Sequence, residues 1–430
     1  MSTPERDFSF QEAAFFFFFF GLGEFPERHV FARVSRIDQI GAGPLARSVI
    51  EFDTVTADAG DQAADWIKSA APEHDADFGL LRLTTTPSKF AKFANDIVDV
   101  QPGFWFHLEL NPNQSAEGMR AWFAGSTPLG FTAFSKGRVV KGERLVSSID
   151  PAPRPASLGA ASVPALALPS AIAAVCRIPQ RLSRLSAQDV LTRVPQADKV
   201  LVHDVGQGSF TTLLREGRPC LHFDVGAPTA FNAKGARSVP FTVDLDARVP
   251  IVLSHWDWDH FHAAFQIQSL RRCRWIVPDQ ILGPGAARLA RGLADARRLY
   301  MWSGGSSSFN VGDLGECTGL GRNGTGLAMR ASLLDGRSIL LAGDADYNSL
   351  PFGTLQFDGL VATHHGGRAH SVFSMPPTPI GRSSYVISYG ASNVYRHPHD
   401  EALTLHSNVG WAGPVRTASF DGIARGDRVL

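Results

Sequence analysis

The chain has 430 residues, 44% of them hydrophobic, which is enough for two or three domains with cores of their own. Lysine plus arginine and aspartate plus glutamate both number 41, so the formal net charge is zero. This balance excludes a global field that would draw the protein onto nucleic acid or an anionic membrane, so a polyanion would need a local patch.

Cysteine spacing indicates the redox environment. Cys176, Cys220, Cys273 and Cys317 are widely separated and form no CxxC pair, a pattern that fits neither a disulfide framework nor a zinc ribbon. We therefore expect a cytoplasmic protein. The phenylalanine run at 15–20 is too short to span a bilayer and follows an acidic residue, so we expect a buried element or docking patch and no membrane association.

The first third of the chain alternates strand-like and helix-like segments. The predicted strands are His29–Ile37, Ser48–Val55, Phe78–Thr84 and Phe104–Leu110, and the predicted helices are Lys89–Val98 and Ala116–Phe123. They predict a smaller α/β or α+β domain over residues 1–147. The segment has no phosphate loop, nucleophile elbow or metal cluster, so its role stays open between selecting the substrate and binding a protein partner.

A stretch rich in proline, alanine and serine, residues 148–180, predicts an interdomain linker. A helix-like segment, Arg181–Arg193, opens the second predicted domain, residues 181–430. Its first strands, Lys199–His203, Ser209–Leu214 and Cys220–Phe223, run into glycine-containing turns.

The densest chemistry follows an apolar run at 249–253 that is typical of a buried strand. The next residues include His255, Asp257, Asp259 and His260, which can all bind metal and fall within six positions. If the chain continues extended, its period of two directs the first pair to one side, and the turn re-aims the second pair. Such a pattern suits two adjacent metal ions, although aspartate and histidine also cap helices and close turns.

Two further apolar strands end in residues of the same kinds. Ser338–Ala342 leads into Asp344, and Leu360–Thr363 leads into His364 and His365. Because open sheets build sites where several strand ends converge, we expect these side chains to join the first four.

Six segments in this order resemble the metallo-β-lactamase fold superfamily, with the greatest likeness to the soluble hydrolase domain of ComEC/Rec2-type DNA-uptake proteins. They cover a little over half the chain and read DVGQGSF, LHFDVG, LSHWDWDHFHAA, LLAGDADY, VATHHGG and YVISYGASNVYRHPHDEAL. The resemblance implies an α/β fold, a four-layer αβ/βα sandwich with one or two metal ions along one edge of its sheets.

The resemblance also implies a role for each matching residue. His255 and Asp257 would serve the first metal, and Asp259 and His260 the second. Asp344, rather than Asp346, would bridge the ions or complete the second site, and either His364 or His365 would be the late histidine ligand.

Other residues would support the centre. Asp224 would orient a ligand histidine, and Asp204 takes a similar supporting position. His397 matches a histidine beside the metals and is the candidate acid, while Asn393 with His397 would contact substrate. His262 would be a structural histidine or an extra ligand.

The sequence departs from the family pattern in one interval. No histidine lies between His262 and Asp344 to complete the first metal's ligands, so this site would be weakly occupied or completed by a residue from the other domain. Asp257 in place of imidazole hardens the ligand set, which makes manganese or magnesium plausible beside zinc.

These features predict a metal-dependent hydrolase in which Asp259 orients a metal-activated water. A phosphodiesterase or nuclease is favoured, and the seven arginines and two aspartates between Arg271 and Arg298 would neutralise phosphates, unless they form a solvated helix face. Two alternatives remain: a hydrolase of a small ester, lactone or lactam, and a weakly catalytic or non-catalytic subunit of a larger, for example defence, complex.

Overall fold

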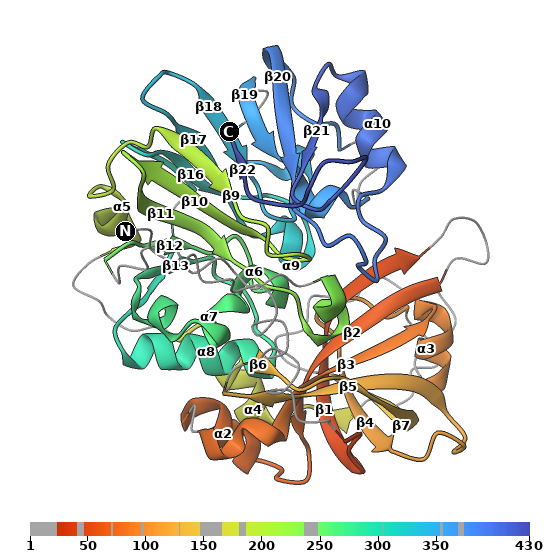
Figure 1. Ribbon diagram of the computed structural model, residues 1–430. Coiled ribbons are helices and arrows are strands. Elements are labelled where there is room, and N and C mark those ends of the chain that lie inside the picture. Colours follow the sequence, from red (N-terminus) through yellow and green to blue (C-terminus); the bar gives the residue numbers. More distant parts are fainter. Residues whose placement is uncertain are drawn as a thin grey trace, which may run out of the picture.

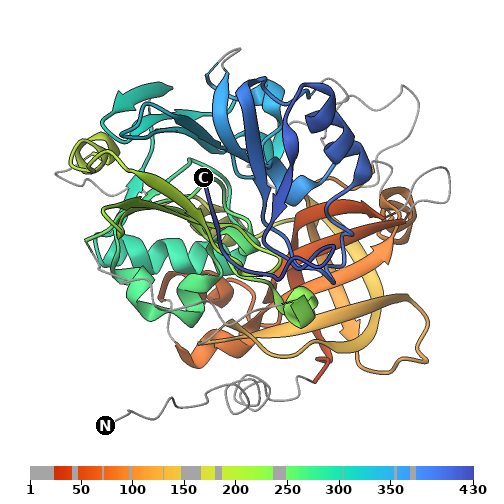
Figure 2. The ribbon, with the colours of Figure 1, turned by 45° about the horizontal axis from the view of Figure 1, so that its top comes forward.

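The computed structural model describes residues 24–40, 47–69, 72–95, 99–128, 130–146, 166–179, 186–235, 248–303, 305–352, 356–368 and 374–430. The phenylalanine run and most of the predicted linker lie outside the described residues. Figures 1 and 2 show a barrel formed by the N-terminal part of the chain, in red and orange, beside two β-sheets formed by the rest. The chain is an α/β protein.

The N-terminal sheet has the strand order β6-β5-β3-β2-β1-β4-β7-β8. An additional pairing of β5 with β7 closes it into a barrel, which leaves few free strand edges. Its strands are β1 (Arg28–Ile40), β2 (Arg47–Thr56), β3 (Phe78–Thr85), β4 (Trp105–Asn111), β5 (Met119–Thr127), β6 (Gly130–Phe131), β7 (Ser135–Val146) and β8 (Leu166–Ala167).

The first four predicted strands are confirmed, because they coincide with β1 to β4. The predicted helix Lys89–Val98 overlaps α3 (Pro87–Phe93), which begins after the cap residue Thr86. The predicted helix Ala116–Phe123 is wrong: most of this segment belongs to β5, which pairs with both β3 and β7.

The short helices α2 (Gln62–Ser69) and α4 (Ser170–Val175) and the 3₁₀ turn η1 (Pro72–Asp77) lie beside the barrel. Since the barrel pairings are antiparallel, the arrangement is closer to the α+β alternative than to α/β. The described part of the predicted linker, residues 166–179, contains β8 and α4, and Ile172 of α4 is buried.

The rest of the chain forms two seven-stranded sheets. The first has the order β14-β13-β12-β11-β10-β9-β22. Its strands are β9 (Lys199–Val202), β10 (Phe210–Arg215), β11 (Arg218–Val225), β12 (Ile251–Val252), β13 (Trp275–Val277), β14 (Leu299–Met301) and β22 (Arg428–Val429). From β11 to β14 neighbouring strands are parallel, so their carboxyl ends meet at one edge.

The second sheet runs in the order β15-β16-β17-β18-β19-β20-β21. Its strands are β15 (Ser306–Phe309), β16 (Gly312–Glu316), β17 (Leu327–Ser332), β18 (Ser338–Leu341), β19 (Phe357–Val361), β20 (Pro379–Ile387) and β21 (Ala412–Arg416). Here too one half, β18 to β21, is parallel. The parallel halves supply the strand ends where chemistry is expected.

Helices and 3₁₀ turns connect these strands. They are α5 (Ala187–Leu191), η2 (Ala230–Gly235), α6 (Trp258–Phe261), α7 (Ala263–Gln266), η3 (Gln268–Arg272), α8 (Pro284–Asp295), α9 (Gly321–Gly324), η4 (Tyr347–Ser349), η5 (Thr363–Gly366) and α10 (Asp400–Asn408). No helix of the described residues is both long and apolar enough to cross a lipid bilayer.

Among the described residues, three apolar cores lie on the faces of the two sheets, and a fourth lies among the barrel strands. One lies between the two sheets and includes Phe223 of the first and Met329 of the second. A second core covers the other face of the second sheet and contains Trp411, with Leu403 of α10 packed against it. The third covers the other face of the first sheet and joins residues of both the barrel and α8, including Val55 and Leu289.

The barrel is bound to the sheets by specific contacts. The Asp53 carboxylate of β2 accepts hydrogen bonds from the backbone N–H groups of Gly285 (3.0 Å) and Ala286 at the start of α8. A Cβ on Gly285 would lie 2.6 Å from the Trp258 ring, which explains glycine at this close approach. Phe131 of β6 packs edge-on against Trp258, with ring centroids 4.6 Å apart. The barrel is therefore an integral wall of the fold.

Candidate metal centre

The metal-competent motif leaves the end of β12 and ends in α6. Its two tryptophans, Trp256 and Trp258, are buried in the core shared with the barrel. Asp257, between them, has extended backbone before the first residue of α6. Successive side chains of the motif thus point to opposite sides. The aromatic side chains pack the loop against the core, and the polar side chains face the edge where the strands end.

Four buried side chains from three loops converge there, and we name them the Asp259 cluster: Asp259, His260, Asp344 and His365. The Nε2 atom of His260 lies 3.1 Å from Asp344 Oδ1 and 3.9 Å from Asp259 Oδ1. The Nε2 atom of His365 lies 3.3 Å from Asp259 Oδ2 and 3.9 Å from Asp344 Oδ1. Ligand atoms of Asp259, His260 and His365 all lie within 4.8 Å of one another.

The opposite ring nitrogen of each histidine is anchored. His260 Nδ1 lies 2.8 Å from the Asp224 carboxylate, and His365 Nδ1 lies 2.8 Å from the Ser388 carbonyl, which it is placed to donate to. Asp224 is held in turn by the N–H (2.7 Å) and hydroxyl (2.8 Å) of Ser254. Such anchoring fixes the tautomer and aims Nε2 at a metal.

The atoms that face the middle of the cluster have no hydrogen-bond partner. They are Nε2 of His260 and His365 and both carboxylate oxygens of Asp344, all buried. Buried acceptors without donors are costly unless a cation satisfies them. Two imidazoles and two carboxylates match the ligands that zinc and manganese take in proteins, so the residues fit a divalent metal ion.

The first half of the motif is arranged differently. His255 Nε2 lies 3.9 Å from Asp257 Oδ2 and 3.9 Å from Asp344 Oδ2. Asp257 Oδ1 accepts a hydrogen bond from Nη1 of Arg322 in α9 at 3.0 Å. His255, His260 and Asp344 form a second group within 4.8 Å of one another. The structure thus brings His255 to the centre and pairs Asp257 with an arginine.

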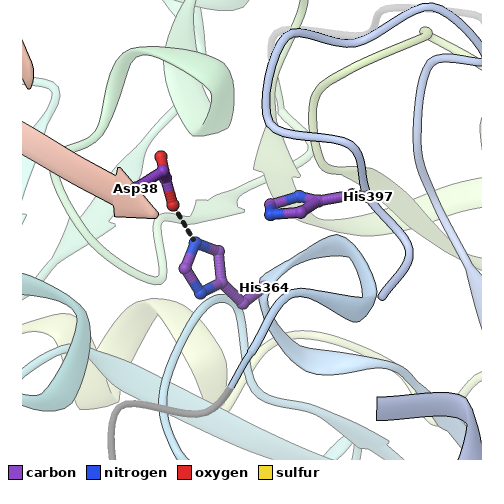
Figure 3. Close-up of side chains that lie close together, drawn as sticks. All are labelled: Asp38, His364 and His397. Carbon is purple, nitrogen blue, oxygen red and sulfur yellow. Dashed lines mark ion pairs between the residues drawn. The ribbon is translucent and has the colours of Figure 1, made fainter. Parts of the chain in front are cut away.

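His364 and His365 are neighbours in the sequence but face different partners. Both have left-handed backbone, with φ of 51° and 54°, a conformation that non-glycine residues adopt mainly where the surroundings enforce it. His365 joins the Asp259 cluster, whereas His364 Nε2 lies 3.4 Å from Asp38 Oδ1 of β1 and 3.7 Å from Asp344 Oδ2. Figure 3 shows the ion pair of His364 and Asp38 with His397 beside it. The geometry favours His365 as the metal ligand.

The end of β1 carries an arginine into the same place. Arg36 Nη1 donates to Asp259 Oδ2 at 2.8 Å, and its Nη2 lies 3.0 Å from His364 Nε2. The guanidinium also pairs with Asp38 and lies over the Tyr395 ring, 4.2 Å from its centroid. Arg36 is 5% exposed, so the barrel both covers the centre and places a buried cation in it.

These contacts set the charge of the carboxylates. Burial alone would raise the pKa of Asp259, but Arg36 and then His365 hold it well below its usual range. Burial is likewise outweighed at Asp344, where His260 and then His364 keep the pKa low. At Asp257 burial prevails over Arg322, and the pKa is raised. Asp259 and Asp344 are thus ionised acceptors near neutral pH.

His397 stands beside the centre on the loop after β20. Burial, and then the nearby His364, lower its pKa well below the ordinary value, so the ring is neutral near pH 7. Its Nδ1 lies 3.4 Å from Gln207 Nε2, and the Gln207 carbonyl accepts from the Gly390 N–H. Asn393 bonds to the backbone N–H and carbonyl of His397, so its amide shapes this loop.

The remaining sequence candidates have structural surroundings. Asp204 pairs with Arg425, with a shortest distance of 2.6 Å, and accepts from the backbone of Gly206. His262 Nδ1 lies 2.9 Å from the Pro228 carbonyl, and its ring packs between Phe131 and Trp258.

The arginine-rich segment contributes to the interface with the barrel and α4. Arg271 donates to the Ala264 carbonyl (2.7 Å), Arg288 pairs with Asp75 (2.6 Å), and Arg291 donates to the Val175 carbonyl (3.3 Å). All four cysteines are buried.

Three residues of the centre were missed by sequence reasoning. Arg36 and Asp38 form an Arg-x-Asp pair in a strand that is otherwise mostly buried, and charged residues at buried strand positions are their signal. Arg322 lies between glycines in a stretch typical of a turn and gave no signal.

No protein-family model matches the chain, and no curated protein sequence matches it. Several solved structures are similar to parts of it. A diphosphatase of the PhnP family is 12% identical, with a TM-score of 0.30, over 54% of this chain and 97% of its own. A putative metallo-β-lactamase from Thermotoga maritima is 14% identical, with a TM-score of 0.24, over 34% and 79%.

A metallo-β-lactamase from Cronobacter sakazakii is also 14% identical, with a TM-score of 0.21, over 40% of this chain and 68% of its own. Scores this low transfer no activity to the chain, so the functional conclusion depends on the site itself. The likeness to the ComEC/Rec2 hydrolase domain stays a prediction.

Proposed function

We propose that the chain is a metal-dependent hydrolase of phosphodiesters on a metallo-β-lactamase-type αβ/βα sandwich. One observation carries this proposal: the Asp259 cluster gathers two imidazoles and two carboxylates, in which Nε2 of both histidines and both oxygens of Asp344 lack hydrogen-bond partners and the histidines are anchored from behind. A purely structural polar cluster would satisfy these atoms with donors from the protein.

A divalent cation held by the Asp259 cluster supplies Lewis acidity and acidifies water. Asp259 and Asp344 balance its charge, and anchored His260 and His365 keep their lone pairs toward it. His397 lies beside Asp38 and His364 in Figure 3, and its ring centroid is 6.2 Å from that of His365. As a neutral ring whose Nδ1 is near Gln207, it can donate a hydrogen bond from Nε2 to the departing oxygen of the substrate.

Arg36 supports an anionic substrate. Its guanidinium lies within hydrogen-bond distance of Asp259 and His364, and arginine is well suited to bind phosphoryl oxygens. A neutral lactone or carboxylic ester, unlike a phosphodiester, carries no charge in its ground state for the guanidinium to bind. Three residues near the end of β1 are buried: Arg36, Asp38 and His364. A site enclosed in this way favours a small phosphodiester substrate over a polymer that lies across the surface.

The direct test is hydrolysis by protein purified without chelator and then loaded with Mn²⁺ or Zn²⁺. The panel contains bis-p-nitrophenyl phosphate, cyclic nucleotides, oligonucleotides, p-nitrophenyl acetate and a simple lactone. We expect metal-dependent turnover of the first two, which is lost in Asp259→Asn and reduced in Arg36→Met. Preferred cleavage of oligonucleotides would make the protein a nuclease, and preferred cleavage of the neutral esters would contradict the role of Arg36.

A second measurement separates an enzyme from a non-catalytic subunit. His397→Gln should reduce turnover of the phosphodiester while the bound metal, measured by mass spectrometry, is unchanged. Metal content below about half an ion per chain in the wild type, together with no turnover on the panel, would instead support a non-catalytic subunit.

A further inference from the structure

Arg322 lies where the motif would lead one to expect the first of two metal ions. Its Nη1 atom donates to Asp257 Oδ1 at 3.0 Å and to the Trp256 carbonyl at 2.8 Å. The side chain is 6% exposed, so the ion pair is shielded from solvent. Arginine stays protonated at every physiological pH, so its charge is permanent.

The turn that carries Arg322 is fixed in place. The Gln280 side-chain amide donates to the Arg322 carbonyl (2.6 Å), and its carbonyl accepts from the Trp256 N–H (3.1 Å). After the turn, the Leu327 N–H donates to the Ser254 carbonyl (2.7 Å). A Cβ on Gly326 would lie 2.4 Å from that carbonyl oxygen, so the segment packs directly on the start of the motif. The guanidinium is therefore held against Asp257 from both ends of its turn.

The two halves of the motif offer a cation very different surroundings. Asp259 has two imidazole nitrogens and the Asp344 carboxylate around it. Asp257 has a single imidazole, His255, at 3.9 Å and the arginine on its other side. Among the described residues, no group of three candidate ligand atoms within 4.8 Å of one another includes Asp257.

Arg36 does not affect the Asp259 cluster in the same way. It occupies one oxygen of Asp259 and approaches from the barrel, while the other ligands of the cluster remain gathered. At the site expected for the first metal ion, Arg322 instead binds the Asp257 carboxylate. Without Arg322, that carboxylate would complete a set of metal ligands with His255 and Asp344. A second cation there would lie beside a permanent positive charge and would have fewer ligands.

We propose that Arg322 replaces the first metal ion, so that the centre binds a single divalent cation, in the Asp259 cluster, beside a built-in guanidinium. This inference rests on the proposed function for its chemistry, but it concerns metal stoichiometry and can be tested without substrate. In this arrangement, His255 borders the single metal site next to Asp344, and Asp257 holds Arg322 in place.

The test is a titration of metal-free protein with Mn²⁺ or Zn²⁺ by calorimetry, with bound metal counted by mass spectrometry after gel filtration. We expect one ion per wild-type chain. Arg322→Gln keeps a donor for the Trp256 carbonyl but removes the charge, and should raise the stoichiometry toward two. The double variant Arg322→Gln with Asp257→Asn should return to one, because the second ion needs the Asp257 carboxylate.

Arg330→Gln is the matched control, because Arg330 pairs with Asp313 on the second sheet and should leave the count at one. Two ions in the wild type would overturn the proposal, and so would a single ion in a folded Arg322→Gln. If that variant does not fold, Asp257→Asn decides: an unchanged single ion supports the proposal, and the loss of an ion contradicts it.

Stoichiometry and activity can fail independently. One ion with no phosphodiester turnover would support the single site and overturn the proposed function. Two ions with phosphodiester turnover would overturn the single site and support the proposed function.

Discussion

The adjacent histidines His364 and His365 show how a one-residue step changes chemistry. Both are buried with left-handed backbone, yet one faces the barrel and the other faces the Asp259 cluster. The sequence offered both as ligands and could not choose between them, because the choice depends on which imidazole the strained turn directs toward Asp259. The contact of His365 Nδ1 with the Ser388 carbonyl makes that choice in the structure.

We therefore predict that His365→Ala and His364→Ala differ in metal binding. Loss of His365 removes a ligand and should weaken metal affinity by more than the roughly 100-fold that losing a supporting hydrogen bond costs. His364→Ala should keep the full complement of metal, as measured by competition with a chromogenic chelator. Equal losses in the two variants would mean that the metal lies between them.

Glu51 is a second residue whose behaviour follows from burial. Burial raises its pKa to about 7, although Arg36 and Arg82 oppose the shift. In the unfolded chain it ionises near its ordinary pKa of about 4.5. Between those values the folded state holds a proton that the unfolded state has lost, so Glu51 makes the fold less stable as the pH rises.

We predict that Glu51→Gln gains stability relative to wild type between pH 5 and pH 8, by at most about 3 kcal/mol from a pKa difference of about 2.5. Urea unfolding at the two pH values measures this difference. Glu73→Gln, at an exposed glutamate, is the control and should track the wild type. A Glu51→Gln curve parallel to that of the wild type would show that Glu51 ionises normally.

Among the elements, α8 links the two parts of the chain. Its first residues lie against β2, where Asp53 accepts the N–H groups of Gly285 and Ala286 that no helical carbonyl can reach. A side chain from another domain thus acts as the helix cap. Burial raises the pKa of Asp53 to about 6 despite these two hydrogen bonds, so the cap is a strong acceptor only above that pH.

We expect Asp53→Ala to lower the free energy of unfolding by about 1–2 kcal/mol at pH 8, the usual cost of losing a helix cap. The loss should be larger at pH 5, because the raised folded-state pKa means that the burial cost of the ionised carboxyl outweighs its stronger hydrogen bonds, so Asp53 contributes less stability as the pH rises. Chemical denaturation of both proteins at each pH tests this, with Asp58→Ala, at an exposed turn residue, as control. A smaller loss at pH 5 than at pH 8 would contradict the raised pKa of Asp53.

Element prediction from sequence succeeded where strand-forming residues gather in short runs and failed where pairing overrides propensity. The strands β1 to β4 were recognisable because β-branched, aromatic and other apolar residues are frequent in them. The segment Ala116–Phe123 contains good helix formers, but in the fold it pairs with β3 and β7 on both sides. These partners are distant in sequence, and a local pattern does not reveal them.

At the site, sequence order located the strand ends but not the ion pairs. Asp259, His260 and Asp344 follow β12 and β18 as the pattern predicts, since parallel strands place their carboxyl ends together. The pairings of Arg36 with Asp259 and Arg322 with Asp257 join residues far apart in the chain, with no local signal. The assignment of metal roles itself stays a prediction.

For the whole molecule, the barrel and the first of the two sheets share a core. Val55 and Phe131 of the barrel belong to the same buried cluster as Trp258, Leu253 and Leu289. The sequence predicted a linker between separate domains because proline, alanine and serine gather at 148–180, and composition alone does not show that α4 packs into that core.

We predict that residues 181–430 expressed alone do not unfold cooperatively and bind metal poorly. The fragment would expose the apolar face that the barrel covers and would lose Arg36 and Asp38 from the centre. Calorimetric unfolding, dye binding to exposed apolar surface and metal titration together test this. A cooperative transition with metal affinity equal to that of the full chain would show that the domains are independent.

In the loop after β12, buried tryptophans alternate with candidate metal ligands, which limits how far protein engineers could transfer or vary this loop. Trp256 and Trp258 are sunk into the common interior while their neighbours in sequence face the candidate centre, and Phe131 of the barrel closes over the second of them. Grafting this short peptide onto another protein would transfer the chelating groups but not the surrounding apolar residues whose packing orients them. Libraries that randomise the spacer positions should accordingly lose function as readily as those that randomise the ligands.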